Sequence, residues 1–338
     1  MDQKLIALLR DINENAEAAV RVCGELGEWF KTSRGTRQGD PISPSVFITV
    51  LERAMDKMKE KSIGISVHGM NIGDLRFADD IDVLEEDIDQ LEAAVEELSN
   101  ESKRYGLMLN SEKTKTMVFG AEKIPGKIAV DRKELDNVDH FVYLGSTFTF
   151  DLDCKKEISV RLARGLTSLQ ALDKVWKSKA IKMETKIAVL NTCVFSTILY
   201  GCETWVLTKE YRKRILACEN KCYRKTLRIG WQERVTNAEL YDRIHLEENL
   251  LQKVIQRKMR LFGHICRMKD DRKIKTLVFG MMEGNNRRGR PHREWVDDIV
   301  EWGGANLQEL GQMARDRRRW EAVVKVASDT YGHWNHGA

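Results

Sequence analysis

The stretch GDLRFADDIDVLEED, from Gly73 to Asp87, places two adjacent carboxylates, Asp79 and Asp80, between two apolar runs. Neighbouring carboxylates repel each other, so a fold keeps such a pair where water, a cation or a basic ligand offsets the charge. The short β-like runs on both sides predict a hairpin with the pair at or near its tip. Two carboxylates there suit a hard divalent cation such as Mg²⁺. The alternative interpretation is an exposed acidic turn.

Composition indicates a helix-rich globular protein. The 338 residues are 42% hydrophobic and 32% charged, with 4 prolines, and this length favours two or three structural units. No apolar stretch approaches the ~20 residues of a membrane span, and the amphipathic N-terminus is unlike a signal peptide. Seven scattered cysteines argue against a disulfide framework. We therefore expect an intracellular protein of the nucleus or cytoplasm, with no membrane partner.

Charge is divided unevenly along the chain. The segment from residue 74 to residue 101 is rich in acids and contains one base, Arg76, whereas the segment from 253 to 293 is strongly basic. A basic segment of this kind predicts contact with a polyanion such as RNA or DNA, with solvated helix faces as the alternative. The bases expected to contact a nucleic-acid backbone are Lys253, Arg257, Lys258, Arg260, Arg287, Arg288 and Arg290.

Hydrophobic periodicity predicts an α+β first part followed by helices. Apolar spacing indicates one helix before SRGTRQGDPISP and another after it, with Pro44 in the first turn and Ser43 as its cap. A further helix begins near Ile88 and is closed by Gly106. Beyond residue 151 the pattern is helical, and NNRRGRPH interrupts it as a linker. We expect three parts, at residues 1–150, 151–280 and 281–338.

Four segments resemble, in order and spacing, the reverse transcriptases of non-LTR (LINE-like) retrotransposons. They are RGTRQGDPISPSVF (34–47), FADDI (77–81), GLMLNSEKTKTMVF (106–119) and YLGS (143–146), and the segment from RMKDD to WVDDI is similar to the region after the polymerase in these elements. The resemblance implies a partial polymerase palm in 1–150, a helical thumb or connection in 151–280, and a helical C-terminal unit after the basic linker. It also implies RNA-templated DNA synthesis by two-metal phosphoryl transfer.

The resemblance also implies a role for individual residues and several partners. The expected partners are an RNA template, a DNA primer or target DNA, and deoxynucleoside triphosphates, with Mg²⁺ or Mn²⁺ as the cofactor. The metal ligands would be Asp79 and Asp80, and Lys113 would lie near the triphosphate. Nucleotide and template would be contacted by Arg37, Gln38, Gly39, Pro41 and Phe77. The primer would be gripped by Tyr143, Leu144 and Gly145. The alternatives are a surface lysine at 113 and an ordinary buried strand at 143.

One family feature has no counterpart in this sequence. Members carry a further metal-binding aspartate in an upstream Ala-Phe-Asp strand, but the upstream acids here include Asp2 and Asp11, which sit on or beside the first helix. The resemblance therefore predicts a chain truncated at its N-terminus, with a weakly held metal and no polymerisation by itself. Two alternatives stay open: a non-catalytic nucleic-acid-binding remnant that uses the basic region, and the product of a decayed element without a role.

Cysteines and tryptophans of the helical part have two interpretations each. Cys218 and Cys222, with His264 and Cys266, could be drawn as a zinc site, but one helical turn between apolar cysteines favours core packing. The tryptophans are expected mainly as core anchors, with a few free to stack on bases; they are Trp176, Trp205, Trp231, Trp295, Trp302 and Trp320.

Overall fold

The structure is a computed structural model that describes residues 2–32, 35–119, 126–280 and 293–332. It consists of helices and small two-stranded sheets, in agreement with the predicted α+β class. The backbone divides into two compact units: unit 1 contains residues 1–65, 71–114 and 128–135, and unit 2 contains residues 66–70, 115–127 and 136–338. The predicted linker NNRRGRPH lies outside the described residues, as do Arg287, Arg288 and Arg290.

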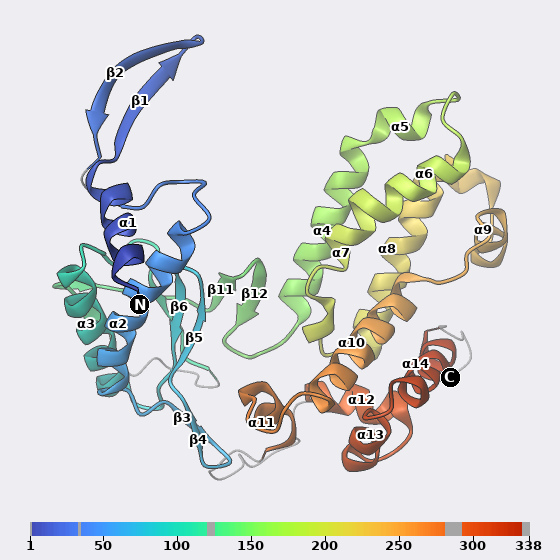
Figure 1. The fold of residues 1–338 in the computed structure, drawn as a ribbon. Helices are drawn as coiled ribbons and strands as arrows, with labels where there is room; N and C mark the ends of the chain where they lie inside the picture. Colours follow the sequence, from blue (N-terminus) through green and yellow to red (C-terminus); the bar gives the residue numbers. More distant parts are fainter. Residues whose placement is uncertain (1, 33–34, 120–125, 281–292, 333–338) are drawn as a thin grey trace. The chain divides into compact units, whose positions relative to one another are not determined.

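Unit 1 combines three helices with antiparallel hairpins (Figure 1). Its elements are α1 (Gln3–Glu14), β1 (Glu17–Val22), β2 (Glu25–Lys31), α2 (Ser43–Lys59), β5 (Asp74–Phe77), β6 (Asp80–Val83), α3 (Ile88–Arg104), β8 (Ala129–Val130) and β9 (Lys133–Glu134). A further hairpin, β3 (Ile65–Val67) and β4 (Met70–Ile72), is divided between the two units.

The core of unit 1 lies between α2 and α3. Met55 and Met58 of α2 pack with Leu98 of α3, and Ile81 and Val83 of β6 lie against this cluster. Helix α3 begins at an Asp87 cap, which accepts hydrogen bonds from the N–H groups of Asp89 and Gln90, both at 3.0 Å. It is followed by Gly106 with φ of +75°, as predicted. The packing fixes one face of hairpin β5–β6 on the helices.

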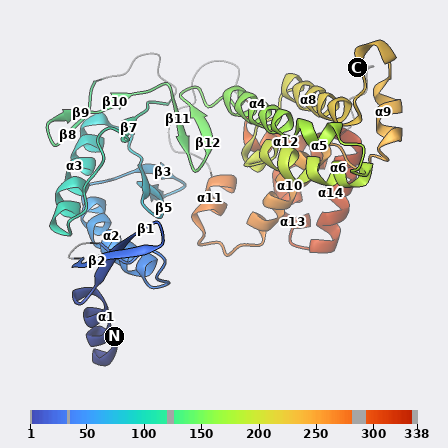
Figure 2. The same cartoon turned by 90° about the horizontal axis from the view of Figure 1, so that it is seen from above.

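Unit 2 begins with short strands and continues as helices (Figures 1 and 2). Its strands are β7 (Lys115–Thr116), β10 (Asp136–Asn137), β11 (His140–Tyr143) and β12 (Ser146–Thr149). Its α-helices are α4 (Lys155–Ala171), α5 (Asp173–Lys177), α6 (Met183–Val189), α7 (Ser196–Ile198), α8 (Lys209–Leu227), α9 (Asn237–Arg243), α10 (Leu250–Cys266), α11 (Lys273–Phe279), α12 (Trp295–Gly303), α13 (Leu307–Met313) and α14 (Arg317–Tyr331). A π-helical turn, Leu190–Phe195, separates α6 from α7.

Helix α10 runs through the core of unit 2. It buries Val254, Met259 and Phe262 among residues of α4, α8, α12 and α14. Gly263 allows α14 to approach closely: a Cβ at this position would lie 2.3 Å from Nε1 of Trp320. The Trp320 indole donates a hydrogen bond to the Met259 carbonyl at 2.9 Å. Helices before and after the undescribed segment 281–292 therefore contribute to one buried cluster.

A fully buried ion pair joins α10 to α12. Lys258 Nζ lies 2.6 Å from Asp298 Oδ2, and both side chains are 0% exposed. The ammonium also donates to the Trp205 carbonyl at 2.7 Å and lies 5.1 Å from the centre of the Trp295 ring. The Asp298 carboxylate accepts further hydrogen bonds from the Leu207 N–H and from Arg293. Each buried charge is thus compensated by a partner and by hydrogen bonds.

Replacing Asp298 by Ala should lower the free energy of unfolding by about 3–5 kcal/mol, because it leaves the Lys258 ammonium buried without its partner. Urea unfolding followed by circular dichroism measures this. The control is Glu321→Ala, which removes the half-exposed ion pair with Arg260 and should cost less than ~1 kcal/mol. Equal losses in the two variants would contradict this account of the core.

A second buried acid lies where α8 meets the start of α10. Glu219 accepts a hydrogen bond from the Leu250 N–H at 2.9 Å, and its side chain is fully buried. Burial raises the pKa of Glu219 from 4.5 to about 8. The folded state therefore binds more protons than the unfolded state between these pH values. The free energy of unfolding consequently decreases as the pH rises through this range.

Glu219→Gln should therefore become progressively more stable than the wild type as the pH rises. The amide stays neutral and can still accept the Leu250 N–H bond. Below about pH 4.5 the two proteins should have similar free energies of unfolding. At about pH 9 the free energy of unfolding of the variant should be higher by up to a few kcal/mol. Thermal or urea unfolding at several pH values tests this; a constant difference across the range would refute a buried titrating Glu219.

The described helices include none that is both long and apolar enough to cross a membrane.

Candidate functional site

Hairpin β5–β6 presents the two adjacent carboxylates at its tip. Phe77 pairs with Asp80 in the antiparallel register, so Ala78 and Asp79 form a two-residue turn. Ala78 adopts a φ of +54°, in the left-handed region that is unfavourable for a residue with a Cβ. Asp79 and Asp80 are both exposed. The hairpin with the acidic pair at its tip was predicted from the sequence.

The two faces of this hairpin have different partners. Ile81 and Val83 lie on the helix-facing side, and their register partners Arg76 and Asp74 lie on the same side. Arg76 forms ion pairs with Asp74 at 2.7 Å and with Glu52 at 2.5 Å. The base nearest in sequence to the acidic pair is therefore engaged elsewhere.

The outward face combines apolar and acidic side chains. It carries Leu75 and Phe77, which are 43% and 64% exposed, opposite Asp82 and Asp80. Burial, with a smaller contribution from the negative charge of Asp80, raises the pKa of Asp82. Among the described residues, no group of three or more His, Cys, Asp or Glu side chains is placed to hold a metal ion. The hairpin thus offers two exposed carboxylates rather than a closed metal site.

The upstream aspartates have structural positions. Asp2 caps α1, with its carboxylate accepting the Lys4 N–H at 3.0 Å. Asp11 lies inside α1 and accepts a hydrogen bond from Asn15. Their placement on this helix agrees with the sequence analysis.

The segment from Arg37 to Pro41 forms an exposed turn before α2. The Asp40 N–H donates to the Arg37 carbonyl at 3.3 Å, and Gln38 and Gly39 lie between them. Gly39 has φ of +88°, and no atom lies within 4 Å of where a Cβ would stand. Glycine is favoured here by backbone conformation and leaves the backbone open to close approach.

The start of α2 differs from the predicted cap. Ser43 is the first helical residue, Ile42 occupies the cap position, and no side-chain cap hydrogen bond is formed. Ser43 Oγ instead donates to the Arg37 carbonyl at 2.6 Å, while Asp40 accepts the Ile42 N–H at 3.0 Å. The serine therefore fastens the preceding turn to the helix. The hydrogen bond from Ser43 to the Arg37 carbonyl, six residues away, takes the place of the predicted cap bond and could not be predicted from local spacing.

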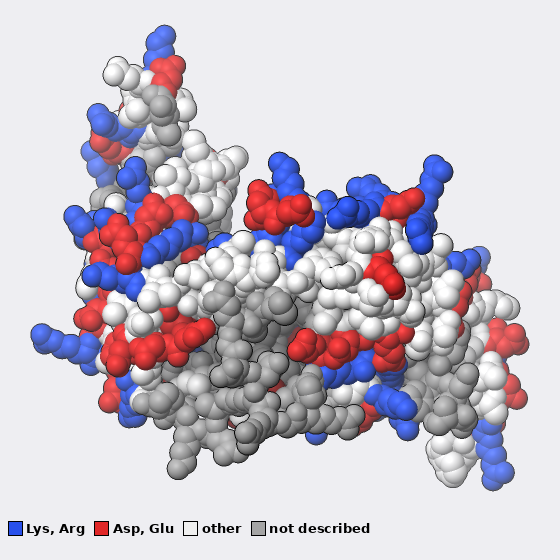
Figure 3. Space-filling view, turned by 90° about the horizontal axis from the view of Figure 1, so that it is seen from below, with Lys and Arg blue, Asp and Glu red and all other residues white. Residues whose placement is uncertain are grey.

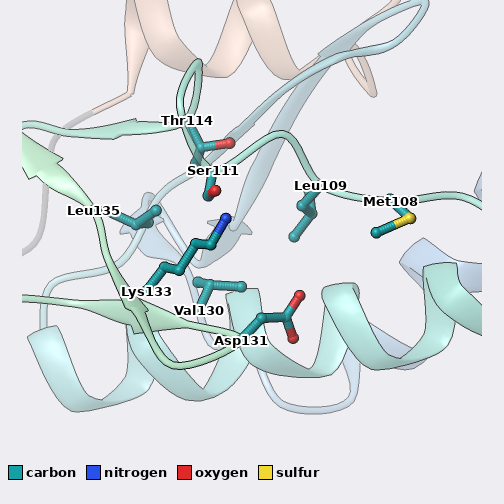
Figure 4. Close-up of a pocket in the computed structure, with 8 residues that line it drawn as sticks. All are labelled: Met108, Leu109, Ser111, Thr114, Val130, Asp131, Lys133 and Leu135. Carbon is teal, nitrogen blue, oxygen red and sulfur yellow. The ribbon is translucent and has the colours of Figure 1, made fainter.

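Lys113 is exposed in a turn organised by Asn110, whose side-chain oxygen accepts the N–H groups of Glu112 and Lys113 at 3.1 and 3.2 Å. Beside this turn is a pocket of about 220 Å³ (Figure 4). Its lining consists of Met108, Leu109, Ser111, Thr114, Val130, Asp131, Lys133 and Leu135. The Lys133 ammonium points toward Ser111 in the close-up, whereas Lys113 is not part of the lining.

The YLGS segment forms a second tight hairpin turn, in unit 2. Tyr143 pairs with Ser146, and the turn residues Leu144 and Gly145 have φ of +47° and +83°. Positive φ at both central residues is the pattern of the hairpin turn that matches strand twist. The turn residues are exposed and Tyr143 is half-buried.

Three residues that sequence analysis missed hold this turn. Tyr200 Oη donates to the Leu144 carbonyl at 2.9 Å, and Arg161 donates to the Gly145 carbonyl while lying 4.4 Å from the Tyr200 ring centre. Glu157 forms a buried ion pair with Arg161 at 2.6 Å. The four-residue spacing of Glu157 and Arg161 was the available signal.

The predicted nucleic-acid bases on α10 are engaged within the protein. Lys253 lies 3.3 Å from Asn191 Oδ1, Arg257 donates to the Leu199 carbonyl at 3.1 Å, and Arg260 pairs with Glu321 at 2.5 Å. Lys258 is fully buried, so its predicted contact with a phosphate is wrong in this structure. Acids and bases are interspersed on the face that Figure 3 shows, as far as its atoms are described. The described bases of α10 therefore all have partners within the protein.

The cysteines agree with core packing. Cys218 and Cys222 are buried one turn apart in α8, and Cys266 is buried in α10. His264 is exposed on α10. Among the described residues these four are not grouped as metal ligands.

Comparisons with known proteins point to one family. Residues 3–148 match the family described as reverse transcriptase (RNA-dependent DNA polymerase). A putative uncharacterized transposon-derived protein of Caenorhabditis elegans is 25% identical over 273 residues, which cover 77% of this chain and 97% of that protein.

Two further relatives are retrovirus-related Pol polyproteins from type-1 retrotransposable element R2. The one from Nasonia vitripennis is 27% identical over 148 residues, covering 40% of this chain and 14% of the polyprotein. One from Popillia japonica is 27% identical over 208 residues, covering 58% of this chain and 27% of the polyprotein. The chain therefore spans nearly all of the worm protein and about a quarter or less of these two polyproteins.

Ala78→Val should destabilise the β5–β6 turn by about 1–3 kcal/mol, because a β-branched residue is strongly disfavoured at positive φ. Amide hydrogen exchange at Phe77 and Asp80, the register pair that closes the turn, should accelerate correspondingly. Ala78→Gly is the matched variant and should leave exchange at these amides unchanged or slower, because glycine adopts this conformation without strain. Faster exchange in the glycine variant than in the valine variant would contradict the turn geometry.

Proposed function

We propose, from the premise that this chain is related to the reverse transcriptases of non-LTR retrotransposons, that it binds nucleic acid and holds a divalent cation through Asp79 and Asp80. In this proposal β5–β6 with α2 and α3 is part of the polymerase palm, and the helices from α4 onward supply a thumb-like nucleic-acid support. RNA-templated DNA synthesis is the activity that we attribute to the enzyme type, and the chain alone does not polymerise.

The observation that carries the metal proposal is the exposed carboxylate pair at a tight turn. Asp79 and Asp80 offer hard oxygen ligands, which Mg²⁺ and Mn²⁺ prefer. The nearby base Arg76 forms its ion pairs with Asp74 and Glu52. A divalent ion bound at the tip would supply positive charge for phosphate oxygens.

The reason to expect no polymerisation is the small ligand set. Among the described residues, Asp79 and Asp80 have no third acidic, histidine or cysteine ligand grouped with them. Two carboxylates alone provide weak affinity and incomplete charge stabilisation for two-metal chemistry. Lys113, Phe77 and the turn from Arg37 to Pro41 are proposed as contacts for nucleotide and template, and Tyr143 to Gly145 as the primer contact.

A second candidate function is nucleic-acid binding without metal chemistry. Its support is the helical unit, whose buried cluster is larger than that of unit 1 and contains no residue of the acidic hairpin. In that case the affinity for RNA would depend strongly on salt and would be indifferent to divalent ions beyond their ionic strength. The metal titration below distinguishes the two candidates.

Mn²⁺ titration by calorimetry should give weak binding to the wild-type chain that is lost in Asp79→Asn/Asp80→Asn. The matched control is Glu86→Gln/Asp89→Asn, which removes the same formal charge from exposed positions beyond the hairpin. The control should bind like the wild type. Identical titrations of the wild type and the Asp79/Asp80 variant would eliminate the metal site.

Primer extension on an RNA template, with Mg²⁺ or Mn²⁺, should give no product with the wild-type chain alone. Extension that disappears in Asp79→Asn/Asp80→Asn would contradict the expected inactivity and mean that another group of the chain completes the metal site. Extension that persists in this variant would instead point to a contaminating polymerase, and repeating the assay with repurified protein identifies it.

A further inference from the structure

We propose that the nucleic-acid contact of unit 2 lies on the exposed side of α8 and on the following loop with Trp231, and that its ligand is single-stranded RNA or DNA. The lysines of α8 would bind phosphates, and the Trp231 indole would stack on a base. This inference rests on the proposed function, because it locates the surface through which the chain holds nucleic acid. It is an alternative to α10, where Lys258 is fully buried.

The exposed side of α8 has a strong excess of positive charge. At 100° per residue, its exposed and half-buried positions fall on one continuous arc, opposite the buried ones. The acid on this arc is Glu210, because Glu219 is turned into the core. The bases on the arc are Lys209, Lys213, Arg214, Lys221, Arg224 and Lys225, and Arg228 follows at the cap position.

The spacing of these bases suits a polyanion chain. Lys209, Lys213, Lys221 and Lys225 stand at four-residue intervals, interrupted once by Ala217. Four helical residues rise about 6 Å, close to two nucleotide steps of about 3.4 Å each. Asp173 lies near the end of the row and pairs with both Lys225 and Lys177, so one carboxylate is shared by two ammonium groups. The local charge therefore remains positive.

Trp231 is exposed on a loop whose backbone is well held. Its side chain is 88% exposed, whereas Trp176, Trp205 and Trp320 are buried. The loop is fastened to the end of α8 by Arg224, whose carbonyl accepts the Ile229 N–H at 2.9 Å. The Arg224 guanidinium donates to the Val235 carbonyl at 3.0 Å.

An exposed indole on such a loop is a preformed platform for stacking. The exposure itself is unfavourable in water, so the position gains from a flat ligand that covers the ring. Base stacking on an aromatic side chain, next to bases that hold the phosphates, is the usual combination for single strands. A lipid surface fits less well, because the arc of α8 carries Ala217 between its lysines instead of an apolar flank.

The charge part of this proposal is tested with fluorescence anisotropy on a labelled single-stranded RNA of about 12 nucleotides, longer than the ~7 nucleotide steps that the lysine row can follow. The variant Lys209→Gln/Lys213→Gln/Lys221→Gln should bind at least about tenfold more weakly. Its slope of log affinity against log salt should fall by about 2, because three phosphate contacts contribute about 0.7 each.

The matched control removes the same charge from three exposed lysines elsewhere in unit 2. Lys269→Gln/Lys273→Gln/Lys325→Gln should bind within about threefold of the wild type, with an unchanged salt slope. Equal effects of the two triple variants would overturn the assignment to α8 while leaving nucleic-acid binding intact. If the wild type binds no RNA at all, the proposed nucleic-acid-binding function fails as well. A folding defect in the triple variant is controlled for with two single variants. Lys221→Glu should bind RNA more weakly than Lys221→Gln, because it places a negative charge at the same position.

The stacking part is tested with Trp231→Ala and Trp231→Phe. The alanine variant should lose about tenfold in RNA affinity at fixed salt with an unchanged salt slope, and the phenylalanine variant should recover most of it. Heparin and phosphatidylserine vesicles serve as anionic probes without bases, and their binding should be insensitive to both substitutions. An equal loss for heparin and RNA, or no loss for RNA, would overturn the stacking role.

Discussion

The ion pair between Lys258 and Asp298 is the constraint on which unit 2 depends. It joins α10 to α12, and through the Trp205 carbonyl and the Leu207 N–H it also fixes the segment that leads into α8. Buried charges are stable only when every partner is in place, so these segments must assemble together. The position of α8, and therefore of its basic arc, is tied to this ion pair, because Arg212 on the buried side of α8 lies 3.9 Å from Asp298.

Sequence reasoning succeeded where the signal was local. Apolar runs on both sides of Asp79 and Asp80 were enough to predict the hairpin, and Gly106 was enough to end α3. It failed where the partner of a residue lies far along the chain. Lys258 resembled its exposed neighbours because Asp298, which neutralises it, is forty positions away, and the run of bases gave no sign of its burial. Trp231 could not be separated from the core tryptophans for the same reason.

Each of the two units contains a predicted site segment that is a tight hairpin turn, and the two turns share one design. Each is a two-residue hairpin turn in which a residue other than glycine adopts positive φ, Ala78 in one and Leu144 in the other. Their supports differ. The turn at Leu144 is fastened by Tyr200 and Arg161, whereas the acidic turn relies on packing of its strands against α2 and α3. Most of these supporting contacts join residues far apart in the sequence and could not be predicted from local spacing. The exception is the pair Glu157 and Arg161, which are four residues apart.

Gly263 has a consequence for how the helical core can change over evolutionary time. The space beside its backbone is taken by the Trp320 indole, so even one methyl group would act as a wedge between α10 and α14. A lineage could replace this glycine only after Trp320 had become a smaller residue, and that change alone would leave a void in the core and remove the indole hydrogen bond to the Met259 carbonyl. Substitutions at the two positions are therefore coupled, because a change at either one alone is unfavourable.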